Sequence, residues 1–141
     1  TNRLAIFGAR WDQPEYQKWK SCWRGILPVN HARNAYAGTK VALNIHNQSY
    51  LRNLEFVTAR PFHSLACGRA TVSDTNSALA ELLPEEESGL LHAVTSNDFV
   101  KYVTRLLQET EMREELAAKG RDFVIRNHNW GLRIDQLLDG L

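Results

Sequence analysis

Apolar residues lie along this chain in short runs, separated by polar or turn-forming residues. Continuous apolar runs of four to eight residues are typical of buried strands. The clearest run is KVALNI at residues 40–45, and the run RLAIF at residues 3–7 ends at a glycine. The pattern predicts five short strands, at residues 3–7, 23–29, 40–45, 70–72 and 89–93.

Between these runs, apolar residues recur at the three- and four-residue spacing of a helix face. Pro14 suits the first turn of a helix, and Gly38 and Gly68 suit positions just after the last turn. The three glutamates at residues 85–87 are expected to form a solvated loop. Helices are predicted at residues 14–21, 31–37, 51–67, 78–83, 99–107 and 111–127, and from residue 130 onward.

Strands that alternate with helices predict an α/β domain with a mostly parallel sheet of about five strands. Right-handed crossovers then place helices on both faces of the sheet, with further helices at the C-terminal end. Ligands of such sheets bind at the carboxyl ends of the strands. We therefore expect the loops at residues 8–11, 46–53 and 74–77 to share one edge of the domain.

Length and composition indicate one ordinary globular domain of 141 residues. No apolar run reaches membrane-spanning length, and no signal segment opens the chain, so we expect a cytoplasmic protein. Cys22 and Cys67 are predicted to be reduced thiols, with a single disulfide as the alternative. The five histidines show no zinc-ligand spacing, so no metal site is expected. The abrupt start at Thr1 suggests a piece of a longer protein.

Residues 10–24 combine four basic side chains with three tryptophans. Such a mixture can form a platform for single-stranded nucleic acid. The simpler interpretation is a buried helix stripe of Tyr16, Trp19 and Trp23, with the basic side chains solvated opposite. The net charge of +1 gives no bulk attraction to nucleic acid or to anionic membranes, so neither partner is expected.

Residues 51–74 are the most informative segment, because they predict a polar loop, a helix, a glycine turn and a strand. Free N–H groups and the dipole at a helix N-terminus attract anions. Arg52, Asn53 and Arg60 lie in or near that zone, and His46 ends the preceding strand. This arrangement suits a ligand that carries phosphate.

Several motifs in this chain resemble the C-terminal half of GT-B glycosyltransferases. They are KVALNIHNQ, the pattern R-x-F-x-x-x-A-C-G at residues 60–68, and an ending with Arg121, His128, Trp130 and Arg133. The match is greatest with the spore-protein CgeB/YkvP-like group of "glycosyl transferases group 1", and it covers essentially the whole chain.

The resemblance implies a Rossmann-like domain, half of a GT-B fold, that binds a nucleotide-sugar donor. It implies transfer of a sugar from a nucleoside diphosphate to an acceptor, without a bound metal or other cofactor. A separate N-terminal domain, which this chain lacks, would hold the acceptor. The chain would then be a fragment of a two-domain hexosyltransferase-type enzyme, and inactive by itself. The alternative is a non-catalytic binding or scaffold domain on the same fold.

One position departs from the family pattern, R-x-F-E-x-x-A-C-G, because His63 stands where the family has Glu. In the family that Glu resembles a carboxylate that accepts hydrogen bonds from the donor ribose. A neutral imidazole offers one acceptor and one donor. Losing a charge-assisted pair costs ~1.5–3 kcal/mol of donor affinity. The related E-x7-E pattern also lacks its first acid, since that position is Phe56.

The candidate donor-binding residues follow from the resemblance and from the predicted edge. They are Gly8, Trp11, His46, Asn53, Arg60, His63, Gly68, Asp74 and Thr75.

Each candidate also has a purely structural alternative. Arg60 can be a solvated helix residue, and His63 can make a local hydrogen bond. Asn53, Asp74 and Thr75 can serve as helix caps, and His46 can be an ordinary loop residue. Gly68 suits a turn with positive φ, and Trp11 can pack against the neighbouring helix. A receiver-type signalling domain would need clustered acids at the strand ends, where only Asp74 lies.

Overall fold

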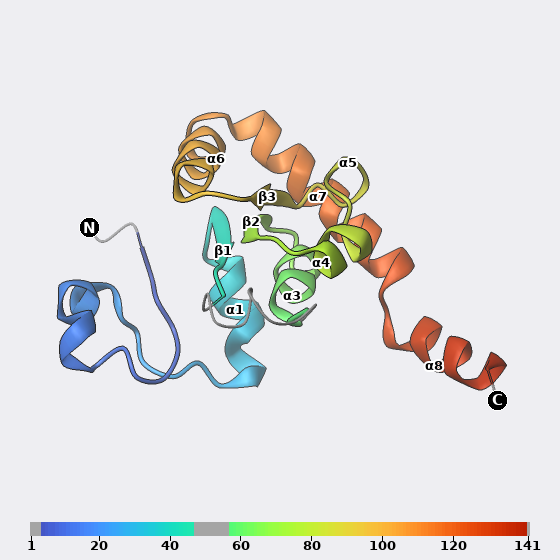
Figure 1. The fold of residues 1–141 in the computed structure, drawn as a ribbon, viewed down its shortest axis with the longest axis horizontal. Helices are drawn as coiled ribbons and strands as arrows, with labels where there is room; N and C mark the ends of the chain where they lie inside the picture. The colour runs from blue at the N-terminus through green and yellow to red at the C-terminus, as the bar shows by residue number, and fades with distance from the viewer. Residues whose placement is uncertain (1–3, 47–56, 141) are drawn as a thin grey trace. The chain divides into compact units, whose positions relative to one another are not determined.

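The computed structural model describes residues 4–46 and 57–140, and its chain divides into two compact units (Figure 1). The first unit is Thr1–Ala35, and the second is Tyr36–Leu141. Helix α1 (Ala32–Ala37) spans the boundary between them. The second unit contains the sheet and the longer helices.

The first unit contains two 3-10 helices, Pro14–Cys22 (η1) and Val29–His31 (η2). The predicted strands at residues 3–7 and 23–29 are not formed in the described part of this unit. A single parallel bridge between Ile6 and Trp23 takes their place. The Trp23 indole also donates from Nε1 to the Gly8 carbonyl at 2.9 Å. Both apolar runs therefore lie side by side without building a sheet.

The predicted buried stripe on the first helix is wrong. No residue of η1 is buried, and Tyr16 and Trp19 are 38% and 39% exposed. The helix is also 3-10 rather than α, and such helices rarely run long because their hydrogen-bond geometry is poorer. The helix occupies the expected position after Pro14, but its aromatic side chains do not form a core.

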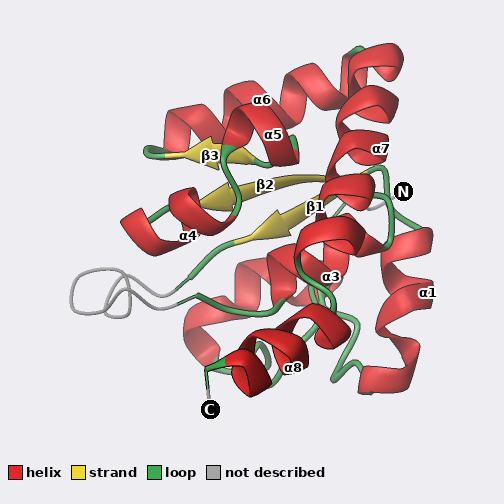
Figure 2. Ribbon diagram, turned by 90° about the vertical axis from the view of Figure 1, so that its right-hand side faces the viewer, coloured by secondary structure: helices red, strands yellow, loops and turns green. Residues whose placement is uncertain are grey.

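The second unit is built on three parallel strands, β1 (Val41–Asn44), β2 (Ala70–Asp74) and β3 (Leu91–Ala93). Their order in the sheet is β1-β2-β3, so β2 is central (Figure 2). Leu43 pairs with Val72, and Ser73 pairs with His92. The parallel sheet is confirmed, but it has three strands in the described residues rather than about five.

Six helices complete the described part of this unit. They are α3 (Arg60–Ala66), α4 (Ser77–Leu82), α5 (Glu85–Ser88), α6 (Ser96–Gln108), α7 (Thr110–Asn127) and α8 (Trp130–Asp139). The predicted helix over residues 51–67 begins in residues outside the described part, and α3 itself starts only at residue 60, beside Pro61. The acidic residues 85–87, predicted as a loop, lie in the short helix α5, which Gly89 ends at a φ of 64°.

Helices lie on both faces of the sheet, as the alternation of strands and helices predicts. Successive strand residues point to opposite faces. On β2, Ala70 and Val72 pack with Leu106 of α6, whereas Thr71 between them contacts Ser64 of α3 through the two hydroxyl oxygens at 2.9 Å. Thus α6 and α3 cover opposite faces, and all five residues of β2 are buried.

Close packing joins α7 to its neighbours at Gly120. A Cβ atom at this position would lie 2.5 Å from Leu65 Cδ2 on α3 and 2.9 Å from the Ser88 carbonyl oxygen on α5. Such separations are too short for real contacts, so only glycine allows α7 to approach this closely. Leu65 belongs to a buried apolar cluster that also contains Leu79, Leu83, Leu90 and Val124.

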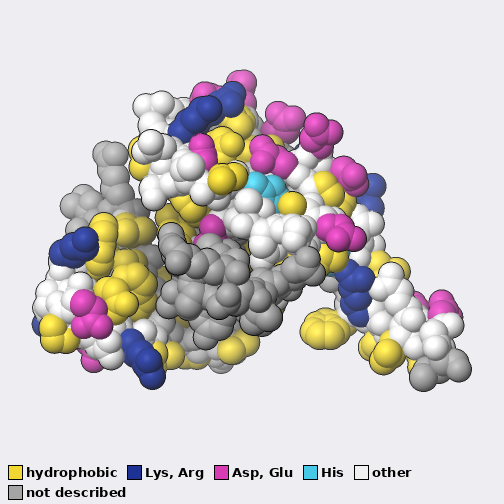
Figure 3. Space-filling model, in the orientation of Figure 1, with side chains coloured by type: hydrophobic (Ala, Val, Ile, Leu, Met, Phe, Trp, Pro, Cys, Tyr) yellow, Lys and Arg dark blue, Asp and Glu magenta, His cyan; other side chains and the backbone are white. Residues whose placement is uncertain are grey.

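Helix α8 exposes apolar side chains, which Figure 3 shows at its lower right. Trp130 is 84% exposed and Leu137 is 68% exposed. Among the described residues, no helix is both long and apolar enough to cross a membrane. Cys22 and Cys67 are both free thiols, as predicted, although Cys67 is only half-buried.

Candidate functional site

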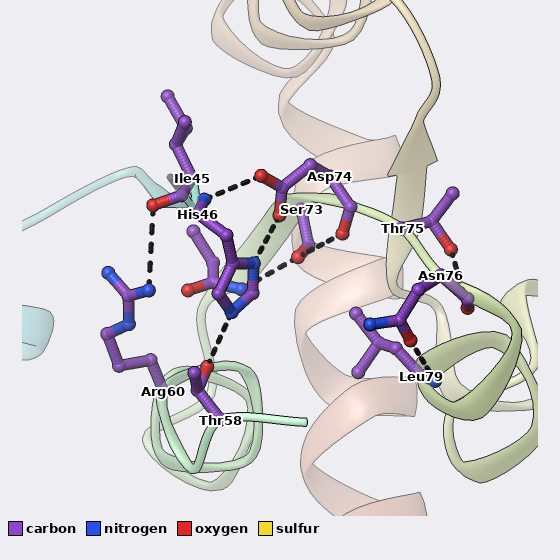
Figure 4. A network of polar contacts seen from close by, with 10 residues as sticks. Ile45, His46, Thr58, Arg60, Ser73, Asp74, Thr75, Asn76 and Leu79 are labelled. Atoms are coloured by element: carbon purple, nitrogen blue, oxygen red, sulfur yellow. Dashed lines mark hydrogen bonds and ion pairs between the residues drawn. The ribbon is translucent and has the colours of Figure 1, made fainter. Parts of the chain in front are cut away.

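Parallel strands β1 and β2 bring His46 and Asp74 together at the carboxyl edge of the sheet (Figure 4). Asp74 is the last residue of β2, and His46 lies two residues beyond β1. The His46 backbone N–H donates to Asp74 Oδ2 at 2.5 Å, and His46 Nδ1 lies 2.5 Å from Asp74 Oδ1. One carboxylate therefore holds both the backbone and the ring of the histidine.

The other ring nitrogen of His46 is also partnered, because Nε2 lies 3.0 Å from Thr58 Oγ1. The side chains of His46 and Asp74 are only 6% and 11% exposed. If Nδ1–H donates to the carboxylate, Nε2 accepts from the Thr58 hydroxyl, and every polar atom of the imidazole is satisfied. We call His46, Asp74 and Thr58 the carboxyl-edge clasp, since they join the ends of two strands to the segment before α3.

A second buried polar contact supports the same edge from inside the sheet. Asn44 Nδ2 donates to Ser73 Oγ at 2.8 Å, and the Ser73 hydroxyl is 2.7 Å from the Asp74 carbonyl oxygen. Asn44 and Ser73 are 2% and 0% exposed. Asn44 Oδ1 has no hydrogen-bond partner within the described residues. The end of β2 is thus fixed by hydrogen bonds on both β1 and its own backbone.

Arg60, the first residue of α3, is exposed beside this clasp. Its Nη2 lies 3.5 Å from the Ile45 carbonyl oxygen, which is the long limit of a hydrogen bond. Its charge also acts on Tyr36, where burial raises the pKa of the phenol while Arg60 opposes the rise. Among the described residues, the guanidinium therefore has one weak contact, and Arg60 is exposed at the carboxyl edge.

His63 lies one turn along α3 from Arg60, and its side chain is exposed. Its backbone carbonyl accepts from the Cys67 N–H at 3.0 Å. Within the described residues, no hydrogen bond of its imidazole is formed, so the predicted local hydrogen bond is absent there. Asn53, another candidate, lies outside the described residues.

Helix capping after β2 belongs to Asn76 rather than to Asp74 or Thr75. Asn76 is the N-cap of α4, and its Oδ1 accepts from the Leu79 N–H at 2.8 Å. Asp74 instead binds His46, and the Thr75 hydroxyl lies 3.3 Å from the Asn76 carbonyl oxygen. The capping role predicted for Asp74 and Thr75 is therefore wrong, but both remain at the carboxyl edge (Figure 4).

The remaining candidates are one residue of the second unit, Gly68, and two residues of the first unit. Gly68 has a φ of 66° in the turn before β2, which confirms its role in the turn and places it at the amino edge of the sheet. Gly8 and Trp11 belong to the first unit. The Trp11 ring lies 5.0 Å from that of Tyr16 on η1, as the packing alternative predicts. A role of Gly8 or Trp11 at the donor site stays a prediction.

Sequence reasoning missed Thr58, which lies inside the helix predicted at residues 51–67. The signal was Pro61, because proline favours the first turn of a helix and so indicates a start near residue 60. Thr58 then falls before the helix, where its hydroxyl is free to meet His46.

Two residues of the C-terminal motif, His128 and Arg133, contact each other. His128 packs against the rings of Phe62 and Phe123, and its Nδ1 lies 2.6 Å from Arg133 Nη2. Burial lowers the pKa of His128, and the nearby Arg133 charge lowers it further. His128 therefore joins the end of α7 to α3 and α8. The described residues contain no cluster of three or more side chains that could hold a metal ion.

The open parallel sheet, the helices on both faces and the polar carboxyl edge define a Rossmann-like α/β domain of the kind found in GT-B glycosyltransferases. The chain belongs to the glycosyl transferase-like family, whose sequence profile matches residues 1–139.

A solved structure supports the fold. Sucrose-phosphate synthase from Thermosynechococcus elongatus superposes with a TM-score of 0.69 over 96% of this chain, at 18% sequence identity. The alignment covers 36% of that protein, so this chain spans about a third of its length. No curated protein matches this sequence.

Proposed function

We propose that this chain is the donor-binding domain of a glycosyltransferase that moves a sugar from a nucleoside diphosphate to an acceptor. The observation that supports this most is the match of the glycosyl transferase-like family to residues 1–139. The carboxyl edge of a parallel sheet is where ligands of such folds bind. In this chain that edge carries His46, Asp74 and an accessible Arg60.

Arg60 is the residue we propose for the diphosphate. A guanidinium can bind phosphate oxygens with two parallel hydrogen bonds. In the described residues, Arg60 has no carboxylate partner and only a long contact to a carbonyl. It would bind the donor and stabilise the negative charge that grows on the departing diphosphate. No metal or other cofactor enters this proposal.

The carboxyl-edge clasp would position this site rather than contact the reacting atoms. His46 and Asp74 already satisfy each other, and both are largely buried. Their hydrogen bonds hold the chain at His46, next to the Ile45 carbonyl that Arg60 contacts, and at Thr58, two residues before Arg60. A rigid backbone there would keep the guanidinium in reach of the diphosphate.

His63 would weaken this donor site compared with the family pattern, which has Glu. The imidazole is exposed on the same helix as Arg60 and makes no hydrogen bond in the described part of the chain. It is therefore available to the donor, but it lacks the charge that lets a carboxylate accept from two ribose hydroxyls. We expect His63→Glu to strengthen donor binding.

Calorimetry with UDP-, GDP- and dTDP-sugars tests this proposal. We expect binding of one nucleotide class, weakened about tenfold or more by Arg60→Ala, since a charge-assisted hydrogen bond to phosphate contributes about 1.5–3 kcal/mol. Lys101→Ala serves as the control, because it removes the same charge from an exposed position on α6 that is far from Arg60 in the sequence. Equal weakening by both substitutions would contradict a specific diphosphate contact.

The acceptor would be held by a second domain, as in the CgeB/YkvP-like glycosyltransferases that the sequence resembles. We therefore expect no sugar transfer by residues 1–141 alone. Turnover of a nucleotide sugar by this chain would show that the second domain is unnecessary.

A non-catalytic binding or scaffold domain is the second candidate, and His63 in the place of Glu favours it. Absence of nucleotide-sugar binding both before and after His63→Glu would support the scaffold. Binding that appears only in the His63→Glu variant would show a donor site that this one position has disabled.

A further inference from the structure

A cleft of about 430 Å³ opens at the amino edge of the sheet, at the opposite ends of β1 and β2 from the clasp. Its walls are the turns before β1 and β2 and one face of α7. This volume is within the range of small-molecule sites. Arg69 directly precedes β2, and Asp74 is its last residue. Five residue steps of extended chain therefore separate them by roughly 16 Å. The cleft is therefore distinct from the candidate donor site.

Four basic side chains and one acidic side chain line this cleft. They are Lys40, Arg69, Arg113, Arg121 and Glu114. The lining thus carries a net charge of +3 (four positive, one negative), whereas the whole chain has a net charge of +1. Within the described ranges, ion pairs of arginine are formed only by Arg105 and Arg126, outside the cleft. Positive charge is therefore gathered here without a bound carboxylate.

Two of the arginines are held in place by neutral acceptors. Arg69 donates from Nε to the Cys67 carbonyl at 3.3 Å and from Nη1 to the Thr39 carbonyl at 3.2 Å. Arg113 donates from Nη1 to the Leu106 carbonyl at 2.8 Å. Carbonyl oxygens fix the orientation of a guanidinium without neutralising its charge. The remaining N–H groups are thus oriented in advance for an anion.

The other two basic side chains are free in the described part of the chain. Lys40 and Arg121 form no hydrogen bond or ion pair there, although the Arg121 stem passes Gly68, where a Cβ would lie 3.5 Å from Arg121 Cδ. Gly68 has no side chain to fill this space, and its φ of 66° strains any replacement. Both free cations can therefore turn toward a ligand in the cleft.

The spacing along α7 indicates a ligand with more than one anionic group. Arg113, Ala117 and Arg121 follow one another at four-residue steps and so share one face of the helix. Eight residues of helix separate the two arginines by about 12 Å along the axis. The small side chain of Ala117 leaves the space between them open. A ligand with several anionic groups can contact both guanidinium groups without drawing the two side chains together.

We propose that this cleft binds a small molecule with several phosphate groups, at a second site apart from the sugar donor. Arginine forks match phosphate oxygens in geometry, and Lys40 adds a mobile point charge. Occupancy would relieve the repulsion among the four cations, so the ligand would also stabilise the fold at this edge.

Titration of the full chain with sodium tripolyphosphate, followed by calorimetry and by amide chemical shifts, tests the proposal. We expect shifts at Thr39, Gly68, Arg69 and Ala117, and a dissociation constant at least about tenfold lower than for inorganic phosphate. Shifts confined to the carboxyl edge, or equal affinity for inorganic phosphate, would overturn it. Equal affinity for citrate would overturn the phosphate class.

Substitutions separate this cleft from general charge effects. The double variant Lys40→Gln and Arg121→Gln should weaken tripolyphosphate binding by about tenfold or more, because it removes two cations that have no hydrogen bond or ion pair within the described residues. Lys101→Gln with Lys119→Gln removes the same charge from exposed positions outside the cleft and should change binding less than about threefold. Similar losses in both double variants would overturn a specific site.

Arg60→Ala distinguishes this inference from the proposed donor site. Tripolyphosphate binding should be unchanged by Arg60→Ala, whereas nucleotide-sugar binding should fall. Loss of tripolyphosphate binding in Arg60→Ala, with retention in the Lys40 and Arg121 double variant, would place the polyphosphate at the carboxyl edge and overturn the second site. Circular dichroism of each variant checks that the fold is kept.

Discussion

At the carboxyl edge of the sheet, His46, Asp74 and Thr58 satisfy one another, whereas at the amino edge basic side chains face a cleft and have no carboxylate partner among the described residues. His46 and Asp74 are nearly buried and use their polar atoms on each other and on Thr58. Arg69 and Arg113 contact only neutral oxygen atoms, and Arg121 has no polar contact in the described residues. A satisfied network stabilises and positions the backbone, while unpaired charge is available for a ligand.

The comparison also shows that a group of polar residues is not by itself a binding surface. The clasp offers a ligand few free donors or acceptors, so Arg60 beside it must supply the proposed contact. At the amino edge, the charge itself is the feature that selects a ligand.

The largest loss is expected from Asp74→Ala at the carboxyl edge. This substitution leaves the His46 backbone N–H and the buried imidazole without their acceptor. Each unsatisfied buried group costs about 1–3 kcal/mol, so the free energy of unfolding should fall by about 3 kcal/mol. Urea denaturation measures the change. Asp135→Ala, on exposed α8, should change stability by less than about 0.5 kcal/mol, and an equal effect of both would mean that the clasp contributes little.

Gly120→Ala tests the helix that forms one wall of the amino-edge cleft. The new Cβ would lie 2.5 Å from Leu65 Cδ2 and 2.9 Å from the Ser88 carbonyl, so α7 must shift away. Overpacking costs about 1–3 kcal/mol, which the better helix propensity of alanine partly offsets. We expect a net loss of about 1–2 kcal/mol in thermal or urea unfolding.

Gly140→Ala is the matched control, because its Cβ would meet only ordinary contacts at 3.6 and 3.7 Å. That variant should be near neutral. A neutral Gly120→Ala would contradict the close approach of α7 to α3 and α5.

The smallest effect is expected from Thr58→Val, which keeps the shape of the side chain but removes the hydroxyl. His46 Nε2 then loses its partner in a ring that is only 6% exposed. We expect a loss of about 1 kcal/mol in the free energy of unfolding. Thr104→Val, an exposed position on α6, is the control. If both variants lose the same free energy of unfolding, the Thr58 hydroxyl does not stabilise the clasp.

Hydrophobic periodicity predicted the second unit well. The run at residues 40–45 contains β1, and the long amphipathic helices α6 and α7 lie within a few residues of their predicted bounds. Each of these elements packs apolar side chains into the core, such as Leu106 of α6 and Val124 of α7, so pattern and structure agree. Periodicity failed for residues 3–7 and 23–29, where short apolar runs pair at only one bridge, between Ile6 and Trp23. An apolar run becomes a strand only where neighbours continue the pairing.

The candidate site was predicted only in part, for a related reason. The sequence indicates that His46 and Asp74 share an edge, because both follow strands of one parallel sheet. It does not show that they bind each other, since that depends on the register that pairs Asn44 with Ser73. The sequence pattern favoured Asp74 as a helix cap. In the structure, the Asp74 carboxylate binds His46, and Asn76 caps α4.

Because β2 lies in the centre of the sheet, its hydrogen exchange can report ligand binding at both edges. All five of its residues are buried, and it pairs with β1 on one side and β3 on the other. Its amide hydrogens should exchange with solvent only when the whole second unit opens. The strand begins beside Arg69 and ends at Asp74, so a ligand at either end that binds only the folded unit should slow exchange along all of β2. Hydrogen exchange of β2 therefore reports ligand binding at either site as a change in one quantity, the free energy of opening of the second unit.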